Sequence, residues 1–139
     1  MSHSILILGD GSESSRCLKL LIEALPGWSV AGEMTCENAV AGSPLRPMPD
    51  VVIAEMDRLD ASMMPLISAI RDKFGGSKLL AVSAQRDSRL VLRMIHAGAN
   101  GFMITDHAPE ELAGAIRTIA AGGMFLSPGI AGLEGRHPR

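Results

Sequence analysis

Aromatic residues are scarce in this sequence. Tyrosine is absent, and three phenylalanines and one tryptophan make up the 3% aromatic share of its 139 residues. A surface that stacks nucleic-acid bases needs more aromatic side chains than this. Positive charge is not in excess either, because 13 lysines and arginines stand against 15 aspartates and glutamates, for a net charge of −2. We therefore expect no contact with DNA by this chain itself.

Cysteines and long apolar runs are also few. Cys17 and Cys36 are the two cysteines, too few for a disulfide framework. We expect both to be small buried side chains in a reducing compartment. The apolar run at residues 5–8 has no cationic segment before it and is far shorter than a signal peptide or a membrane span requires. These absences predict a cytoplasmic protein without membrane contact.

Short apolar runs alternate with segments of helical periodicity along the chain. The expected strands are residues 5–8, 28–33, 50–54, 78–82 and 101–104, and the expected helices are 17–25, 35–43, 63–74, 86–97 and 109–120. This alternation predicts an α/β fold, a doubly wound, flavodoxin-like parallel sheet of five strands in the order 2-1-3-4-5. We expect residues 1–130 to form one domain, and residues 131–139 to be a tail or the start of a linker, with no DNA-binding domain present.

Polar side chains follow four of the predicted strands. Asp10 follows the first strand, Glu55 and Asp57 the third, Ser83 the fourth and Thr105 the fifth. Ligands of such folds lie at the carboxyl ends of the strands. Two neighbouring carboxylates repel unless a cation or a proton lies between them, and carboxylate oxygens suit Mg²⁺. Spacing alone leaves a magnesium site and a solvated pair of loop acids equally open for Asp10 and Glu55.

Four segments resemble the receiver domain of two-component response regulators, within the NarL/FixJ subfamily that carries a LuxR-type DNA-binding domain. They are residues 49–53, 97–102, 108–112 and 121–128, and the resemblance extends from about residue 5 to residue 130. It implies a CheY-like fold and signal transduction through protein contacts rather than enzymatic turnover. It further implies a histidine kinase or another signalling protein as partner, and transcription regulation through a LuxR-type domain outside this chain.

The resemblance also implies a phosphorylation pocket, in which three positions depart from the family pattern. Gly9 takes the place of the first of two metal-binding acids, Glu55 the place of the phosphoacceptor aspartate, and Thr105 the place of a lysine. The longer glutamate displaces the carboxylate from the in-line geometry of phosphoryl transfer, and the cation that would contact the phosphoryl oxygens is lost. We therefore expect a pseudo-receiver that does not run the usual phosphorylation cycle.

Other positions of the family pocket are kept. Asp10 is the second acid, Ser83 the hydroxyl residue and Phe102 the aromatic switch residue. The Mg²⁺ ligands implied are Asp10, Glu55 and the carbonyl of Asp57, one carboxylate fewer than in the family, so we expect weak binding or none. Glu55 either imitates a phosphorylated aspartate with less charge or only maintains a polar pocket; we favour the second.

A different class of function stays open as an alternative. The pattern Gly9-x-Gly11-x-x-Ser14 after a strand, with Glu33 22 residues after Gly11, is similar to a dinucleotide-binding fingerprint. Its third glycine is missing, however, and Asp10 would lie beside the pyrophosphate. The alternatives are thus a small nucleotide- or cofactor-binding flavodoxin-like module, and an atypical receiver that is still phosphorylated.

Two surface features complete the predictions. Ser12, Ser14 and Ser15 precede the first helical stripe, and we expect them to cap that helix. The last helix should bury Leu112, Ile116, Ile119 and Ala120. Its small residues would allow close approach of a second helix, and Met124 and Phe125 follow them, so we expect a homodimer through the last helix; these residues are Ala113, Ala115, Ala120 and Ala121.

Overall fold

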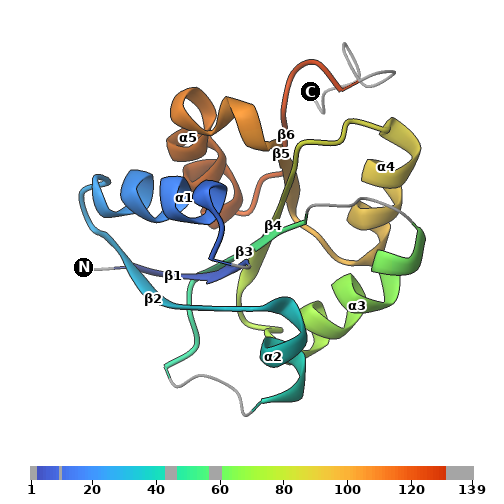
Figure 1. The fold of residues 1–139 in the computed structure, drawn as a ribbon, viewed down its shortest axis with the longest axis horizontal. Helices are drawn as coiled ribbons and strands as arrows, with labels where there is room; N and C mark the ends of the chain where they lie inside the picture. Colours follow the sequence, from blue (N-terminus) through green and yellow to red (C-terminus); the bar gives the residue numbers. More distant parts are fainter. Residues whose placement is uncertain (1–2, 10, 43–46, 57–60, 131–139) are drawn as a thin grey trace.

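The fold is a central parallel sheet with helices on both faces (Figure 1). The computed structural model describes residues 3–9, 11–42, 47–56 and 61–130. The strands pair in the order β2-β1-β3-β4-β5-β6, which confirms the predicted order and adds a sixth strand. The strands are β1 (His3–Leu8), β2 (Trp28–Met34), β3 (Val51–Glu55), β4 (Lys78–Ser83), β5 (Gly101–Ile104) and β6 (Phe125–Leu126).

Helices connect the strands, and three of them begin at a residue whose side chain caps the helix. Ser12, Thr35 and Asp87 each accept a hydrogen bond from a backbone N–H two or three residues further on. The last helix has Pro109 and two glutamates in its first turn instead. No helix in the described part of the chain is long and apolar enough to cross a membrane. The helices are α1 (Glu13–Glu23), α2 (Cys36–Ala41), α3 (Met64–Lys73), α4 (Ser88–Ala97) and α5 (Ala108–Ala120), with 3₁₀ turns η1 (Ala61–Met63) and η2 (Thr105–His107).

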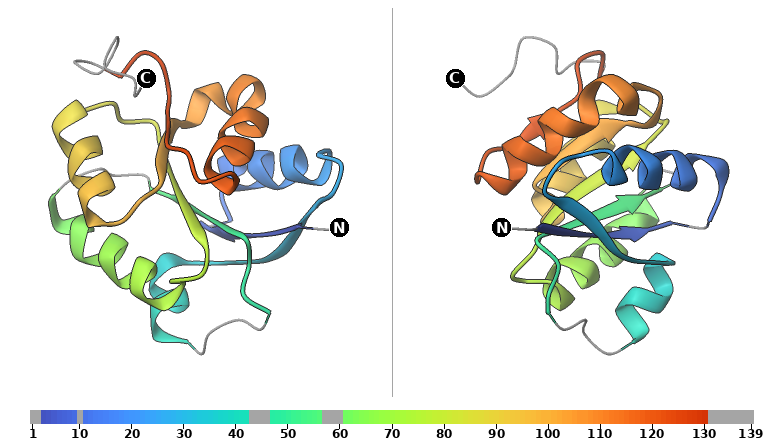
Figure 2. Two further views of the ribbon diagram at one scale, coloured as in Figure 1. Left: turned by 180° about the vertical axis from the view of Figure 1, so that it is seen from behind. Right: turned by 90° about the vertical axis from the view of Figure 1, so that its left-hand side faces the viewer.

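The core has two halves, one on each face of the sheet. Helices α1 and α5 cover one face, and α2, α3 and α4 cover the other (Figure 2). Successive side chains of a strand point to opposite faces, so the central strands contribute alternately to both halves. Towards α1 and α5 point Ile5, Ile7, Val51 and Ile53, and towards α2–α4 point Leu6, Leu8, Val52 and Ala54. A strand buried on both faces reads as a continuous apolar run, which is why these runs predicted the sheet.

The two cysteines occupy different environments. Cys36 begins α2 and is buried; burial and then the charge of Glu37 raise the pKa of its thiol to about 11. Cys17 is exposed, so the prediction that both cysteines are buried is wrong for this one. The buried stripe of α1 runs through Ser15, Leu18 and Ile22, and a helix turns by about 100° per residue, which takes Cys17 off that stripe.

The last helix also differs from its prediction. Its buried residues include Leu112, Ala115, Ile116 and Ile119, whereas Ala120 is exposed. The predicted stripe is therefore wrong at Ala120. Ala115 is fully buried against the sheet, so it is not available to a partner helix, contrary to the prediction.

The segment after α5 returns along the edge of the sheet as β6, which the sequence analysis did not predict. Phe125 and Leu126 pair in parallel with Gly101 and Phe102 of β5. A Cβ atom on Gly101 would lie 2.7 Å from the carbonyl oxygen of Phe125, so the absence of a side chain there permits the close approach of β6. The N–H of the following Ser127 donates to the carbonyl of Phe102 at 3.0 Å.

Candidate functional site

Three of the predicted site residues lie at the carboxyl ends of neighbouring strands. Glu55 is the last residue of β3 and pairs with Val82 of β4. Ser83 ends β4 and pairs with Ile104 of β5, which is followed directly by Thr105 at the start of η2. The juxtaposition expected from the topology is therefore present for Glu55, Ser83 and Thr105. The predicted ligands Asp10 and Asp57 lie outside the described residues.

The Glu55 carboxylate is held by the first turn of α1. Val51 and Ile53 face α1 and α5, and the alternation of the strand puts Glu55 on the same face. The hydroxyl of Ser15 donates a hydrogen bond to Oε1 of Glu55, and Ser15 itself is fully buried. The other oxygen, Oε2, is buried and has no hydrogen-bond partner among the described residues. Burying an acceptor without a partner costs about 1–3 kcal/mol.

Little space is left for a side chain at residue 9, beside the Ser15–Glu55 hydrogen bond. A Cβ atom on Gly9 would lie 3.1 Å from Oε1 of Glu55 and would overlap with the hydroxyl oxygen of Ser15. A side chain at residue 9, where the resemblance places the first metal-binding acid, therefore cannot be accommodated while Ser15 and Glu55 keep these positions. The sequence predicts helix capping by Ser12, Ser14 and Ser15 together, and one of the three performs it. Ser12 is the cap, accepting from the N–H of Ser15 at 3.4 Å.

The described residues do not fit a magnesium site. Gly9 has no side chain to provide a ligand, and Oε1 of Glu55 is engaged by Ser15. Only Oε2 of Glu55 remains as a carboxylate oxygen without a partner here. No group of three or more acidic, histidine or cysteine side chains that could hold a metal occurs in the part of the chain that the structure describes. Mg²⁺ usually keeps several waters, but still needs one or two carboxylates presented to it.

The remaining predicted site residues are packed or partly covered. Ser83 is fully buried, and its hydroxyl accepts a hydrogen bond from the N–H of Gln85 at 3.1 Å. Phe102 is also fully buried, in the half of the core formed with α2–α4. Thr105 is half-buried and carries no charge. The neighbouring Asp106 is exposed, with a carboxylate oxygen 4.0 Å from Arg86 Nη2, an ion pair that water screens strongly.

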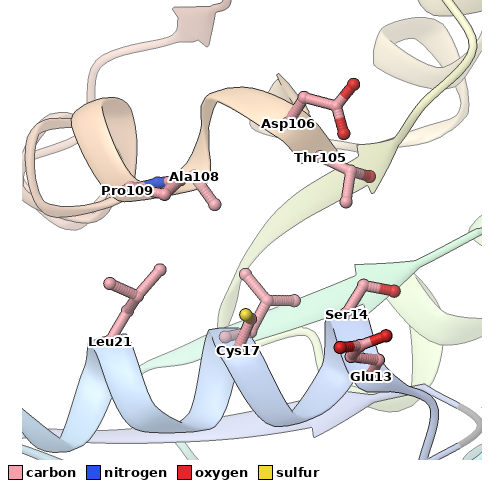
Figure 3. Close-up of a pocket in the computed structure, with 9 residues that line it drawn as sticks. Glu13, Ser14, Cys17, Leu21, Thr105, Asp106, Ala108 and Pro109 are labelled. Atoms are coloured by element: carbon pink, nitrogen blue, oxygen red, sulfur yellow. The ribbon is translucent and has the colours of Figure 1, made fainter.

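A separate pocket of about 430 Å³ lies between α1 and the start of α5. Figure 3 shows that Leu21 and Cys17 of α1 face Ala108 and Pro109 of α5. The other end of the pocket is polar; its lining residues there are Glu13, Ser14, Thr105 and Asp106. Thr105 thus connects this pocket with the strand ends that carry Glu55 and Ser83.

Comparison with known proteins identifies regulators among the curated relatives. No protein-family model matches the chain. A nitrate/nitrite response regulator protein homolog of Haemophilus influenzae is 24% identical over 129 residues, covering 93% of this chain and 62% of the relative. The transcriptional regulatory protein UhpA of Escherichia coli is 34% identical over 94 residues, covering 68% of this chain and 46% of the relative. The chain therefore spans less than two thirds of these relatives.

Solved structures show which part of such regulators the chain corresponds to. A two-component response regulator of the LuxR family from Aurantimonas sp. SI85-9A1 has a TM-score of 0.81 and 27% identity, covering 98% of this chain and 99% of that one. The isolated REC domain of RcsB from Salmonella enterica serovar Typhimurium, in its apo form, has a TM-score of 0.75 and 16% identity, covering 96% of this chain and 99% of that one, a likeness of fold.

The strand order and the likeness of both structures over nearly the whole chain define the fold as that of receiver domains of response regulators. The similar sequences indicate the family within this class of domain. The chain belongs with the LuxR-family response regulators, as the resemblance in its sequence predicted.

Proposed function

We propose that this receiver domain transmits a signal through protein contacts without the usual aspartyl phosphorylation cycle. The observation that carries the proposal is the Ser15–Glu55 hydrogen bond at the end of β3. It occupies an oxygen of the carboxylate that stands at the phosphoacceptor position, beside a residue 9 that has no side chain.

The chemistry of phosphoryl transfer supports this proposal. Such transfer depends on a nucleophilic oxygen in line with the phosphorus and on cations that neutralise the phosphoryl oxygens. Oε1 of Glu55 is turned towards α1 and engaged, and Thr105 cannot replace a cation. A carboxylate carries one negative charge where a phosphoryl group carries about 1.5 to 2. We therefore propose that Glu55 maintains the pocket rather than imitating the phosphorylated state.

The output belongs to the same proposal. The relatives are named as response regulators and a transcriptional regulatory protein, and this chain matches less than two thirds of their length. We propose that the domain contacts a histidine kinase or another signalling protein and acts in transcription regulation through a LuxR-type domain, without enzymatic turnover. The absence of a disulfide between Cys17 and Cys36, both free thiols, fits a cytoplasmic location.

A homodimer through the end of α5 is the second element of the proposal. Ala121 and Met124 are exposed, and Ala113 is half-buried. This leaves a small-residue surface at the end of the helix even without Ala115. We expect sedimentation to detect a dimer of the wild type at micromolar concentration, and Ala121→Glu to weaken it because a charge would be buried in the interface. A wild type that remains monomeric contradicts this element, and circular dichroism controls for folding.

Phosphoryl donors and analogues test the central claim. Acetyl phosphate should leave the intact mass of the wild type unchanged, and beryllofluoride should cause no shift at Glu55 in NMR spectra. The RcsB receiver, for which a structure with phosphomimetic BeF₃⁻ exists, is the positive control for the reagent. A stoichiometric adduct at Glu55 would overturn the proposal, and one at Asp57 would show that the acceptor position is misassigned.

A further inference from the structure

Ser15 stands out because it is a fully buried polar side chain on the apolar stripe of a helix. It precedes Leu18 by three residues and Ile22 by seven on that stripe, and both of those side chains pack in the core. A hydroxyl at such a place needs a partner, because burying it unbonded is costly. Its partner is Oε1 of Glu55, 40 residues away in the sequence.

We infer that Ser15 fills the space beside Glu55 at the carboxyl end of β3. Its hydroxyl occupies the volume and the hydrogen-bonding position that a side chain at residue 9 would otherwise take. The inference rests on the proposed function and gives it a structural cause. A Cβ atom on Gly9 would overlap with Oγ of Ser15, whereas the Cβ of Ser15 is 3.5 Å away, an ordinary contact. A Cβ atom at residue 9 would therefore overlap with the hydroxyl oxygen, which would have to rotate away from Glu55 to admit it.

The position of Ser15 in the first turn of α1 adds an electrostatic contribution. The N-terminus of a helix carries a partial positive charge, which stabilises a nearby carboxylate. Ser12, the cap of this helix, has its hydroxyl oxygen 3.1 Å from that of Ser14 and 3.5 Å from that of Ser15. Hydroxyl groups of Ser12, Ser14 and Ser15 thus line the helix end that faces Glu55. The hydrogen bond between Ser15 and Glu55 joins α1 directly to β3.

The inference makes residues 9 and 15 energetically coupled. Gly9 is not in the left-handed region, so alanine there is opposed by the neighbours and not by the backbone. Gly9→Ala should lower the melting temperature by roughly 5–10 °C, and Ser15→Ala by about 5 °C. The double variant should melt at or above the temperature of Ser15→Ala, because the methyl group then fills the space left by the hydroxyl.

Two further variants separate the causes. Ser15→Cys retains a side chain of similar size but a weaker donor, so Gly9→Ala should remain as damaging in that background as in the wild type. Gly32→Ala on β2 is the matched control, since its Cβ atom would meet only Leu6 Cδ1 at 3.6 Å; it should respond equally with Ser15 or Ala at position 15. Additive effects of Gly9→Ala and Ser15→Ala would overturn the inference.

A second measurement concerns cation binding. The combined variant Gly9→Asp/Ser15→Ala should bind Mg²⁺ at least tenfold more tightly than the wild type or Gly9→Asp alone, with NMR shifts at Glu55 as the readout. Equal affinity with and without Ser15 would contradict the role of the hydroxyl. The two hypotheses fail separately: a beryllofluoride adduct on the wild type refutes the proposed function, whereas the coupling of residues 9 and 15 is measured by melting alone.

Discussion

The carboxyl end of β3 and the β5–β6 edge use buried polar groups in opposite ways. At β3, Glu55 keeps one oxygen bonded to Ser15 and leaves the other buried without a partner in the described structure. At the other edge, the hydroxyl of Ser127 accepts from the N–H of Ile104 at 2.9 Å and donates to Oε1 of Glu111 at 2.5 Å. The end of β3 thus has a buried acceptor without a partner. At the β5–β6 edge, one hydroxyl joins β5, α5 and the segment that follows β6.

The two regions also differ in how closely their sequences resemble the family. The β5–β6 edge is built from two segments that resemble the family, residues 97–102 and 121–128, whereas Gly9 after β1 and Glu55 at the end of β3 are the positions proposed to depart from it. The packing of the sheet edge does not depend on the chemistry of the pocket, because they are held by different hydrogen bonds. We propose that a receiver scaffold can keep this sheet edge while the residues at the carboxyl end of β3 change.

The largest effect should come from filling the β5–β6 contact. Gly101→Ala places a methyl group 2.7 Å from the Phe125 carbonyl oxygen and 3.2 Å from its nitrogen, both backbone atoms that cannot move aside alone. We expect a loss of about 2–3 kcal/mol in the free energy of unfolding, measured by urea denaturation. Gly114→Ala, with nothing within 4 Å, is the control and should gain about 0.5–1 kcal/mol. Equal responses would show that β6 does not pack tightly on β5.

A smaller loss should follow removal of the Ser127 hydroxyl. Ser127→Ala leaves the N–H of Ile104 without its acceptor and Oε1 of Glu111 without its donor, which should cost about 2 kcal/mol in the free energy of unfolding. Hydrogen exchange of the Ile104 amide should become faster as well. Ser29→Ala serves as control, because its hydroxyl contact to the His3 carbonyl is long, at 3.4 Å, and exposed. A loss of stability equal to that of the control would show that the Ser127 hydroxyl does not hold β5, α5 and the segment after α5 together.

The smallest effect should occur at Glu55. In Glu55→Gln the amide oxygen still accepts from Ser15, and the buried oxygen without a partner is replaced by an NH₂ group. We expect a change of less than about 0.5 kcal/mol in the free energy of unfolding, because the hydrogen bond from Ser15 is kept and one buried polar group without a partner replaces another. A loss above 2 kcal/mol would mean that the carboxylate charge itself stabilises the fold. Denaturation of both proteins in parallel measures the difference.

Much of the fold could be predicted from the sequence because each element carries its own signal. Apolar runs identified β1, β3, β4 and β5, and Gly98, at φ 127°, ends α4 directly after the predicted helix 86–97. The sixth strand has no such signal: it is only two residues long, and pairing with β5 rather than periodicity makes it a strand.

The candidate site was predictable only in part. Topology placed Glu55, Ser83 and Thr105 at neighbouring strand ends, and the alternation of β3 determines which face Glu55 occupies. The partner of Glu55 was missed, although a signal existed: Ser15 lies on the stripe of Leu18 and Ile22, and a polar residue at a buried helical position needs a partner.

What the sequence by itself determined is therefore local and periodic: the types of the elements, their order, the two-faced burial of the central strands and the residue types at their carboxyl ends. Only the tertiary structure decided which groups meet across the fold. The Ser15–Glu55 bond joins residues 40 positions apart, and the Ser127–Ile104 bond joins residues 23 apart. Such contacts depend on how helices and strands pack, because a hydroxyl or a carboxylate can bond to any complementary group that packing brings within about 3 Å.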